Sequence, residues 1–154
     1  MKKLLCVLLS TVLLLLAGCG GDSQKTMDMT AFSESVLSSV EYDDELISLS
    51  DKVAGNYYDL EIDGLEGYVI FVSSTSATAN ELAVFHCADS SALEAAKSAV
   101  EARMKDQREA YENYIPDELL RLDNALVKTS GNYLLFSVSN DNETIEKLFD
   151  EALK

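Results

Sequence analysis

His86 and Cys87 are the neighbouring residues that most directly suggest chemistry, because a thiol and an imidazole can form a nucleophile and its base. His86 is the single histidine of the chain. Both residues end the apolar run Leu82–Cys87, which is typical of a strand, and neighbours on a strand point to opposite faces. We therefore expect a strand histidine beside a small buried thiol, and we predict no catalytic residue.

The carboxylates are numerous enough for acid–base chemistry but single out no pair. With 27 Asp and Glu residues, a hydrolase that uses two carboxylates stays open as a function. It is the least favoured function, because such an enzyme needs two carboxyl groups at a defined spacing and the sequence does not show which pair would have it. The run Asn140–Glu143 lacks the glycine and the distant glutamate of a calcium loop, and it favours a strand-to-helix turn. Residues 59–64 are similarly expected to be a solvated turn. The sequence predicts neither a metal site nor a cofactor.

A further candidate site is the far end of a long helix expected over residues 90–114. The apolar stripe of this helix begins with aliphatic side chains and ends with Gln107, Tyr111 and Tyr114. Such a helix is about 37 Å long, whereas strands of six or seven residues reach only about 20–23 Å, so its end overhangs the sheet.

This overhanging end has two interpretations. The N-terminal helices or the segment around Pro116 would cover it, or it is a partner surface, since Tyr and Arg are favoured at protein interfaces. The candidate partner surface consists of Arg103, Gln107, Arg108, Tyr111 and Tyr114.

The N-terminus carries a targeting signal. Two lysines precede the apolar run Leu4–Leu16, which is too short for a comfortable membrane span and leads into small residues before Cys19. The ending Leu16-Ala17-Gly18-Cys19 resembles the lipobox of bacterial lipoproteins. This resemblance implies cleavage before Cys19, lipid on Cys19, and a protein anchored on the extracytoplasmic face of the cell membrane.

The predicted organisation has three parts. Residues 1–18 are expected to be the signal peptide, residues 19–29 a lipidated tether, and residues 30–154 a single domain. Cys6 leaves with the signal and Cys19 carries lipid, so only Cys87 remains and no internal disulfide is expected.

The charge of the chain limits its partners. Its net charge is −15, which argues against binding to DNA or RNA because such binding needs clustered Lys and Arg. An anionic bilayer would also repel the domain, so we expect it to stand off the membrane surface. The expected partners are the membrane, through lipid at Cys19, and an envelope protein.

Periodicity predicts the order of the elements. Two N-terminal helices are expected, one with Thr30 as its N-cap and one that begins at Asp43 and Asp44 and stops at Gly55. The remaining elements, in order, are strands at 68–72 and 82–87, a helix at 90–114, a helical turn at 117–122, strands at 125–129 and 133–138, and a closing helix from residue 140.

This order predicts an α+β fold. The ββαββα pattern gives one mainly antiparallel sheet of four strands, formed by two hairpins side by side, with the helices of this pattern packed on one face. Both alternating sets of strand residues are apolar, which indicates that both faces are at least partly covered. One set is Val69, Phe71, Ala83, Phe85, Leu134, Phe136 and Val138, and the other is Tyr68, Ile70, Val72, Leu82, Val84, Tyr133 and Leu135. The two N-terminal helices would complete the helical layer or cover the other face.

Several short motifs follow one another along residues 45–153. They are Asn80–Phe85, Arg103–Gln107, Tyr114–Glu118, Asn124-Ala125, Gly131–Tyr133 and Val138–Asp141. As an ordered set they resemble the Firmicutes lipoproteins that carry domain of unknown function 4358 (DUF4358). The resemblance implies family membership and a cell-envelope location, and it implies no activity and no site beyond the lipobox cysteine.

The sequence alone thus favours a non-enzymatic, membrane-anchored binding or interaction domain. A small-ligand binding lipoprotein, sensory or transport-associated, is the alternative. A deep pocket with convergent polar groups would favour the alternative, and a convex body with one aromatic patch would favour the interaction domain.

Overall fold

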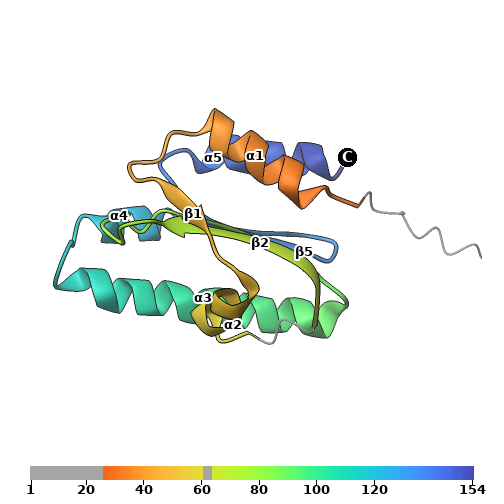
Figure 1. The fold of residues 1–154 in the computed structure, drawn as a ribbon, viewed down its shortest axis with the longest axis horizontal. Coiled ribbons are helices and arrows are strands. Elements are labelled where there is room, and N and C mark those ends of the chain that lie inside the picture. Colours follow the sequence, from red (N-terminus) through yellow and green to blue (C-terminus); the bar gives the residue numbers. More distant parts are fainter. Residues whose placement is uncertain (1–25, 61–63) are drawn as a thin grey trace, which may run out of the picture.

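The computed structural model describes residues 26–60 and 64–154, which build one antiparallel sheet of five strands between helices (Figure 1). The predicted signal peptide, Cys19, most of the predicted tether and the centre of the predicted turn at 59–64 lie outside the described residues. The strands are β1 (Leu46–Ser48), β2 (Leu65–Ser73), β3 (Glu81–Cys87), β4 (Leu126–Ser130) and β5 (Tyr133–Val138). The helices are α1 (Met29–Ser39), α2 (Asp51–Tyr58), α3 (Ser90–Glu112), α4 (Glu118–Asp123) and α5 (Asn142–Ala152).

The sheet contains one strand more than predicted. Its order is β1-β2-β3-β5-β4, so the two expected hairpins, β2–β3 and β4–β5, do lie side by side. The additional strand β1 pairs with β2 at the edge of the sheet. Leu46 and Leu49 were predicted to lie on a helix, but Leu49 instead donates its backbone N–H to Ile70. A three-residue strand gives almost no periodic signal, and pairing with β2 decides its conformation.

The second N-terminal helix is therefore shorter than predicted. Helix α2 begins at Asp51, after the N-cap Ser50, and not at Asp43. Gly55 lies inside the helix, and the left-handed residue that ends it is Asp59, with φ of 47°. Asp43 and Asp44 therefore lie outside the helix, and their side chains bind other segments.

The helices cover both faces of the sheet. Helices α1 and α5 pack against each other on one face, while α2 and α3 lie on the opposite face (Figure 1). The expectation that α3 and α5 share a face is wrong. Since the central strands carry apolar side chains on both sides, each face needs its own helical layer.

Two apolar cores result. The face under α2 and α3 buries Ile70, Val72, Ala83, Phe85, Cys87, Leu134, Phe136 and Val138. The face under α1 and α5 buries Leu82, Val84, Tyr133 and Leu135 together with Phe32, Val36, Ile145 and Phe149. Val69 and Phe71 pack on this second face, although their alternation suggested the side of Phe85. The register pairs Ile70 with Ala83, so Ile70 lies on the same face as Ala83 and Phe85. Val69 and Phe71, its neighbours on β2, therefore point to the opposite face.

The folded domain begins before residue 30. Met27 is buried, and its backbone N–H donates to the Tyr133 hydroxyl at 3.1 Å, so the last residues of the predicted tether belong to the domain. The N-cap of α1 is Asp28, not Thr30. Asp89 and Asp141 are the N-caps of α3 and α5, since each carboxylate accepts a backbone N–H of the first helical turn.

Within the described residues, no helix combines the length and apolar character that crossing a membrane requires.

Candidate functional site

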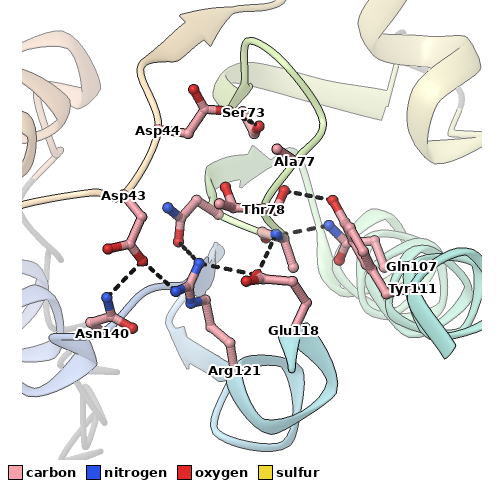
Figure 2. A network of polar contacts seen from close by, with 12 residues as sticks. Asp43, Asp44, Ser73, Ala77, Thr78, Gln107, Tyr111, Glu118, Arg121 and Asn140 are labelled. Atoms are coloured by element: carbon pink, nitrogen blue, oxygen red, sulfur yellow. Dashed lines mark hydrogen bonds and ion pairs between the residues drawn. The ribbon is translucent and has the colours of Figure 1, made fainter. Parts of the chain in front are cut away.

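The connection between β2 and β3, residues 74–80, lies against the second half of α3 (Figure 2). The Tyr111 hydroxyl donates to the backbone carbonyls of Thr78, at 2.5 Å, and Ser76, at 3.2 Å. Gln107 Nε2 contacts the Ala79 carbonyl at 3.4 Å. The overhanging end of α3 is thus covered, and a loop that was expected only to connect two strands contributes to the cover.

Helix α4 fixes the same loop from another side. Glu118 Oε2 accepts the backbone N–H of Ala79 at 2.7 Å. Arg121 Nη1 donates to Glu118 Oε2 and to Asn80 Oδ1, each at 3.0 Å. Arg121 also pairs with Asp43, which accepts from Asn140 Nδ2 at 2.9 Å (Figure 2). The segment around Pro116 therefore does help to cover this end of the molecule, as one interpretation predicted.

The start of the loop is held by Asp44. Its carboxylate accepts from the Ser73 hydroxyl, from the Thr75 hydroxyl at 2.5 Å and from the Thr75 backbone N–H at 3.2 Å. These hydrogen bonds, that from Ser73 foremost, lower the pKa of Asp44 to about 2. Contacts at both ends and in the middle preorganise the loop.

A fully buried carboxylate, Glu81, lies at the base of this region. Its side chain is 0% exposed and pairs with Arg103, whose Nη2 and Nε lie 2.9 and 3.1 Å from Glu81 Oε2. Gln107 Nε2 donates to the same oxygen at 3.0 Å, and the Tyr58 hydroxyl donates to Oε1. Burial raises the pKa of Glu81, and the Arg103 guanidinium opposes that rise.

A pocket of about 350 Å³ opens between the loop and α3. Its walls come from α2, the end of β2, the loop and α3, and they are formed by Tyr57, Ser73, Ser76, Thr78, Asn80, Arg103, Asp106, Gln107, Ala110, Tyr111 and Tyr114.

Three polar atoms of the residues that line this pocket are buried without a hydrogen-bond partner. They are Gln107 Oε1, Asn80 Nδ2 and Thr78 Oγ1. Gln107 and Asn80 are only 4% and 2% exposed. Most buried polar groups are paired, so these three atoms mark an incompletely satisfied polar region beside the pocket.

The hydrogen bonds fix which atom of each amide is unpaired. Gln107 Nε2 donates to the Glu81 carboxylate, so the free atom is the acceptor Oε1. Asn80 Oδ1 accepts from Arg121, so the free atom is the donor Nδ2. Beside the pocket, one buried acceptor, one buried donor and one buried hydroxyl are thus left without a partner.

The predicted partner surface does not form one exposed patch. Gln107 and Tyr111 are buried, at 4% and 8% exposure, and Arg103 is mostly buried in its pair with Glu81. Arg108 pairs with Asp123 at 2.7 Å, and Tyr114 is 79% exposed. Four of these five residues, all but Arg108, instead line the pocket.

His86 and Cys87 do not form a dyad. Cys87 is buried and free on the face of α3, and burial raises the pKa of its thiol. His86 stacks on Tyr133, with ring centroids 4.1 Å apart, and its Nε2 lies 3.3 Å from Glu66 Oε2. Among the described residues, no group of three or more His, Cys, Asp or Glu side chains is arranged to hold a metal ion.

A larger hollow, of about 660 Å³, lies between α2 and the first half of α3 and is lined mainly by small side chains. It borders residues 61–63, which the structure does not describe, and we place no site there.

Comparison with known proteins gives one match, to the family model described as a domain of unknown function (DUF4358), over residues 38–139. The chain belongs to the DUF4358 family. The matched part of this DUF4358 protein contains the sheet, α2, α3, α4 and every residue that lines the pocket. No curated protein and no solved structure shows significant similarity to the chain.

Sequence reasoning identified one side of the pocket of this DUF4358 protein and missed the other. The aromatic end of the helical stripe pointed to Gln107 and Tyr111, but nothing pointed to Thr78, Asn80 or Glu81. One signal was present: a glutamate opens an otherwise apolar strand, and Arg103 and Gln107 are spaced so that both can reach a single partner from one helix face.

Proposed function

We propose that this protein is a lipid-anchored binding protein on the extracytoplasmic face of the cell membrane, and that its pocket between residues 74–80 and α3 binds a small polar ligand. The observation that carries the proposal is the pocket of about 350 Å³ itself, where polar side chains and three tyrosines from α2, β2, the loop and the α3 segment come together. Of the three functions left open by the sequence, small-ligand binding is therefore the best supported.

Binding, and not catalysis, suits the groups available there. Glu81 is fully buried beneath Arg103, Tyr58 and Gln107 and does not line the pocket. Asp106 is an exposed carboxylate at the pocket. This arrangement gives an acid–base mechanism no pair of carboxylates that both reach a ligand. We propose a non-enzymatic role without a resident cofactor.

The ligand-binding proposal is tested with the full-length protein in detergent micelles. A panel of amino acids, amines, organic acids, phosphates, polyols and sugars is screened by thermal shift, and calorimetry confirms each hit. A true pocket ligand should raise the melting temperature and should bind the Asn80→Asp and Thr78→Val variants at least ten times more weakly. Asn132→Asp, an exposed change of equal charge in the β4–β5 hairpin, is the matched control. Hits that bind all variants equally would contradict the proposal.

The membrane anchor has its own test. If Cys19 carries lipid, Cys19→Ala should lose lipid labelling and membrane fractionation, because stable anchoring needs two or more acyl chains. Equal membrane retention of the variant would refute anchoring at this residue.

An envelope protein partner remains a second candidate, favoured by the 79% exposure of Tyr114 beside the pocket. Cross-linking in intact cells should then capture a protein with the parent chain and not with Tyr114→Ala. Unchanged capture would remove Tyr114 from that role.

A further inference from the structure

We infer that the pocket between the loop and α3 binds a small zwitterion, one that carries both an ammonium group and a carboxylate, as a free amino acid or a dipeptide does. This inference rests on the proposed function, and it names the class of the polar ligand. It follows from the charged and aromatic side chains that line the pocket.

Arg103 supplies the positive side of the pocket. Its Nε and Nη2 donate to the buried Glu81, and Nη2 also donates to the Tyr57 hydroxyl. Its Nη1 makes no hydrogen bond to a residue that the structure describes, yet it is not one of the buried unpaired atoms, so it is open to solvent. Since Arg103 lines the pocket, this edge of the guanidinium can donate to a carboxylate there.

The orientation of this guanidinium is fixed before any ligand arrives. Glu81 holds it with two hydrogen bonds, and its Cζ lies 4.0 Å from the centre of the Tyr57 ring. A donor that is already oriented loses little conformational entropy on binding, and this favours affinity.

Asp106 supplies the negative side of the pocket. It lies three residues after Arg103 on α3, so the two side chains leave neighbouring positions of one helix face, with Cβ atoms about 5–6 Å apart. Asp106 is exposed and lines the pocket. Among the described residues it has no ion-pair partner, since the four basic residues of α3 pair with other carboxylates. Its charge is therefore available to an ammonium group.

The two opposite charges favour a ligand that carries both. An anion would be attracted by Arg103 and repelled by Asp106, and a cation would be attracted by Asp106 and repelled by Arg103. Glu81 weakens the field of Arg103, and water weakens that of Asp106, whichever ligand approaches. A zwitterion can place its carboxylate near Arg103 and its ammonium group near Asp106, and with no net charge it is not repelled by a chain of charge −15.

Three tyrosines accommodate the apolar part of such a ligand. Tyr57, Tyr111 and Tyr114 line the pocket, and Tyr114 is 79% exposed. Aromatic side chains pack against apolar groups, and the faces of their rings also attract an ammonium group. A volume of about 350 Å³ lies at the small end of ligand sites, which suits a ligand of this size.

The test compares zwitterions with counterparts that lack one of the two charges. Alanine, leucine, phenylalanine and dialanine are the zwitterions. Each is compared with its amide, which lacks the carboxylate, and with its deaminated analogue, which lacks the ammonium group. Full-length protein is held at pH 7 in a nonionic detergent, and affinity is measured by calorimetry. We expect at least one zwitterion to bind ten times more tightly than both of its counterparts, and equal binding of either counterpart would overturn the inference.

A variant of the acidic side locates the ammonium group. Asp106→Asn should weaken the zwitterion at least threefold, a modest loss because the carboxylate is exposed, and should not weaken the deaminated analogue. Glu101→Gln removes an exposed carboxylate of α3 outside the pocket and is the matched control, which should leave binding unchanged. Equal effects of the two variants on the zwitterion would overturn the inference.

A variant of the basic side locates the carboxylate. Arg103→Lys keeps a positive charge beside Glu81 but removes the planar guanidinium and its free edge. It should weaken the zwitterion at least tenfold and leave its amide unchanged. Thermal melts show whether the variant is folded, and Asp106→Asn decides if it is not.

The outcomes separate this inference from the proposed function. If another compound of the panel binds and is weakened by Asn80→Asp or Thr78→Val, and no zwitterion binds, the zwitterion inference is overturned and ligand binding stands. If no compound binds, both fall. Tighter binding of dialanine than of alanine would identify a peptide as the ligand, and equal or weaker binding would identify a free amino acid.

Discussion

At the scale of single residues, the molecule depends on a carboxylate that is completely removed from water. Glu81 is compensated by one guanidinium and by hydrogen bonds from Tyr58 and Gln107. Breaking such a pair from one side is costly because the charge that stays behind is buried and unpaired. The same contacts orient Gln107, so Glu81 decides which atom of the Gln107 amide is left unpaired.

Replacing Arg103 by Met should therefore lower the free energy of unfolding by about 3–5 kcal/mol. Burial already raises the pKa of Glu81 and the variant removes the opposing guanidinium, so the carboxyl should bind a proton more readily in the folded variant. A group whose pKa is raised in the folded state contributes stability at low pH, and this contribution disappears as pH rises. The decrease in the free energy of unfolding caused by Arg103→Met should therefore be smaller in acid than at neutral pH.

Urea unfolding between pH 4 and 8 measures this loss. The double variant Glu81→Gln/Arg103→Met, which removes the buried charge, should be more stable than Arg103→Met alone at neutral pH. Equal stability of the two would show that the charge is not the cause.

Asp44 should give the opposite pH dependence. Its pKa is lowered from the ordinary value of 3.8 to about 2 by hydrogen bonds, first from Ser73, so it contributes stability above pH 4 that is lost as pH falls towards 2. Asp44→Asn should therefore be less stable than the parent at pH 7, and the difference should shrink between pH 4 and 2. Acid titration followed by circular dichroism checks this, and a difference independent of pH would contradict it.

At the scale of elements, the second half of α3 and the β2–β3 connection form one unit. Tyr111 and Gln107 bind the loop backbone from α3, and Glu118 binds it from α4. The loop positions Thr78 and Asn80 at the pocket, so the pocket depends on these contacts.

Substitutions at Tyr111 of α3 and at Tyr114, which follows the end of α3, should therefore behave differently. Tyr111→Ala should cost about 3–5 kcal/mol, because a buried aromatic side chain is lost. Tyr111→Phe should cost about 0.5–1.5 kcal/mol and should speed hydrogen exchange of the loop amides, because it removes only the hydroxyl bonds to Ser76 and Thr78. Tyr114→Ala, at an exposed position, should stay within about 0.5 kcal/mol of the parent.

Denaturant unfolding and native-state hydrogen exchange measure these effects. An equal decrease in the free energy of unfolding for Tyr111→Ala and Tyr114→Ala would mean that Tyr111 does not hold the loop in place.

At the scale of the whole molecule, the region that matches the family is not a complete folding unit. It spans residues 38–139 and therefore leaves out nearly all of α1 and all of α5. These two helices cover one face of the sheet, where Phe32 packs edge-on against Phe149 at 6.0 Å. Without them, Leu82, Val84 and Leu135 would meet water.

A fragment limited to residues 38–139 should accordingly aggregate or unfold without cooperativity, because it exposes an apolar face larger than monomers tolerate. The parent chain should melt in one transition. Thermal melts and size-exclusion chromatography compare the two, and a monomeric fragment with a cooperative melt would show that α1 and α5 are dispensable.

The sequence by itself determined the type and order of nearly all elements. Alternation of apolar residues, turn residues and acidic caps are local signals, and they placed β5 at its observed bounds and located the starts of α3 and α5 close to Asp89 and Asp141. The prediction of a targeting signal is equally local, because it depends on residue types over the first 19 positions.

Only the tertiary structure decided the properties that depend on residues far apart. Strand β1 exists because β2 offers its edge, and the faces of β2 follow from its register with β3. The pocket depends on Asn80 and Gln107, which belong to different elements, and on Arg121 and Glu81, which fix their amides. No local sequence pattern predicts that these residues come together, since burial and hydrogen-bond partners exist only after the chain has folded.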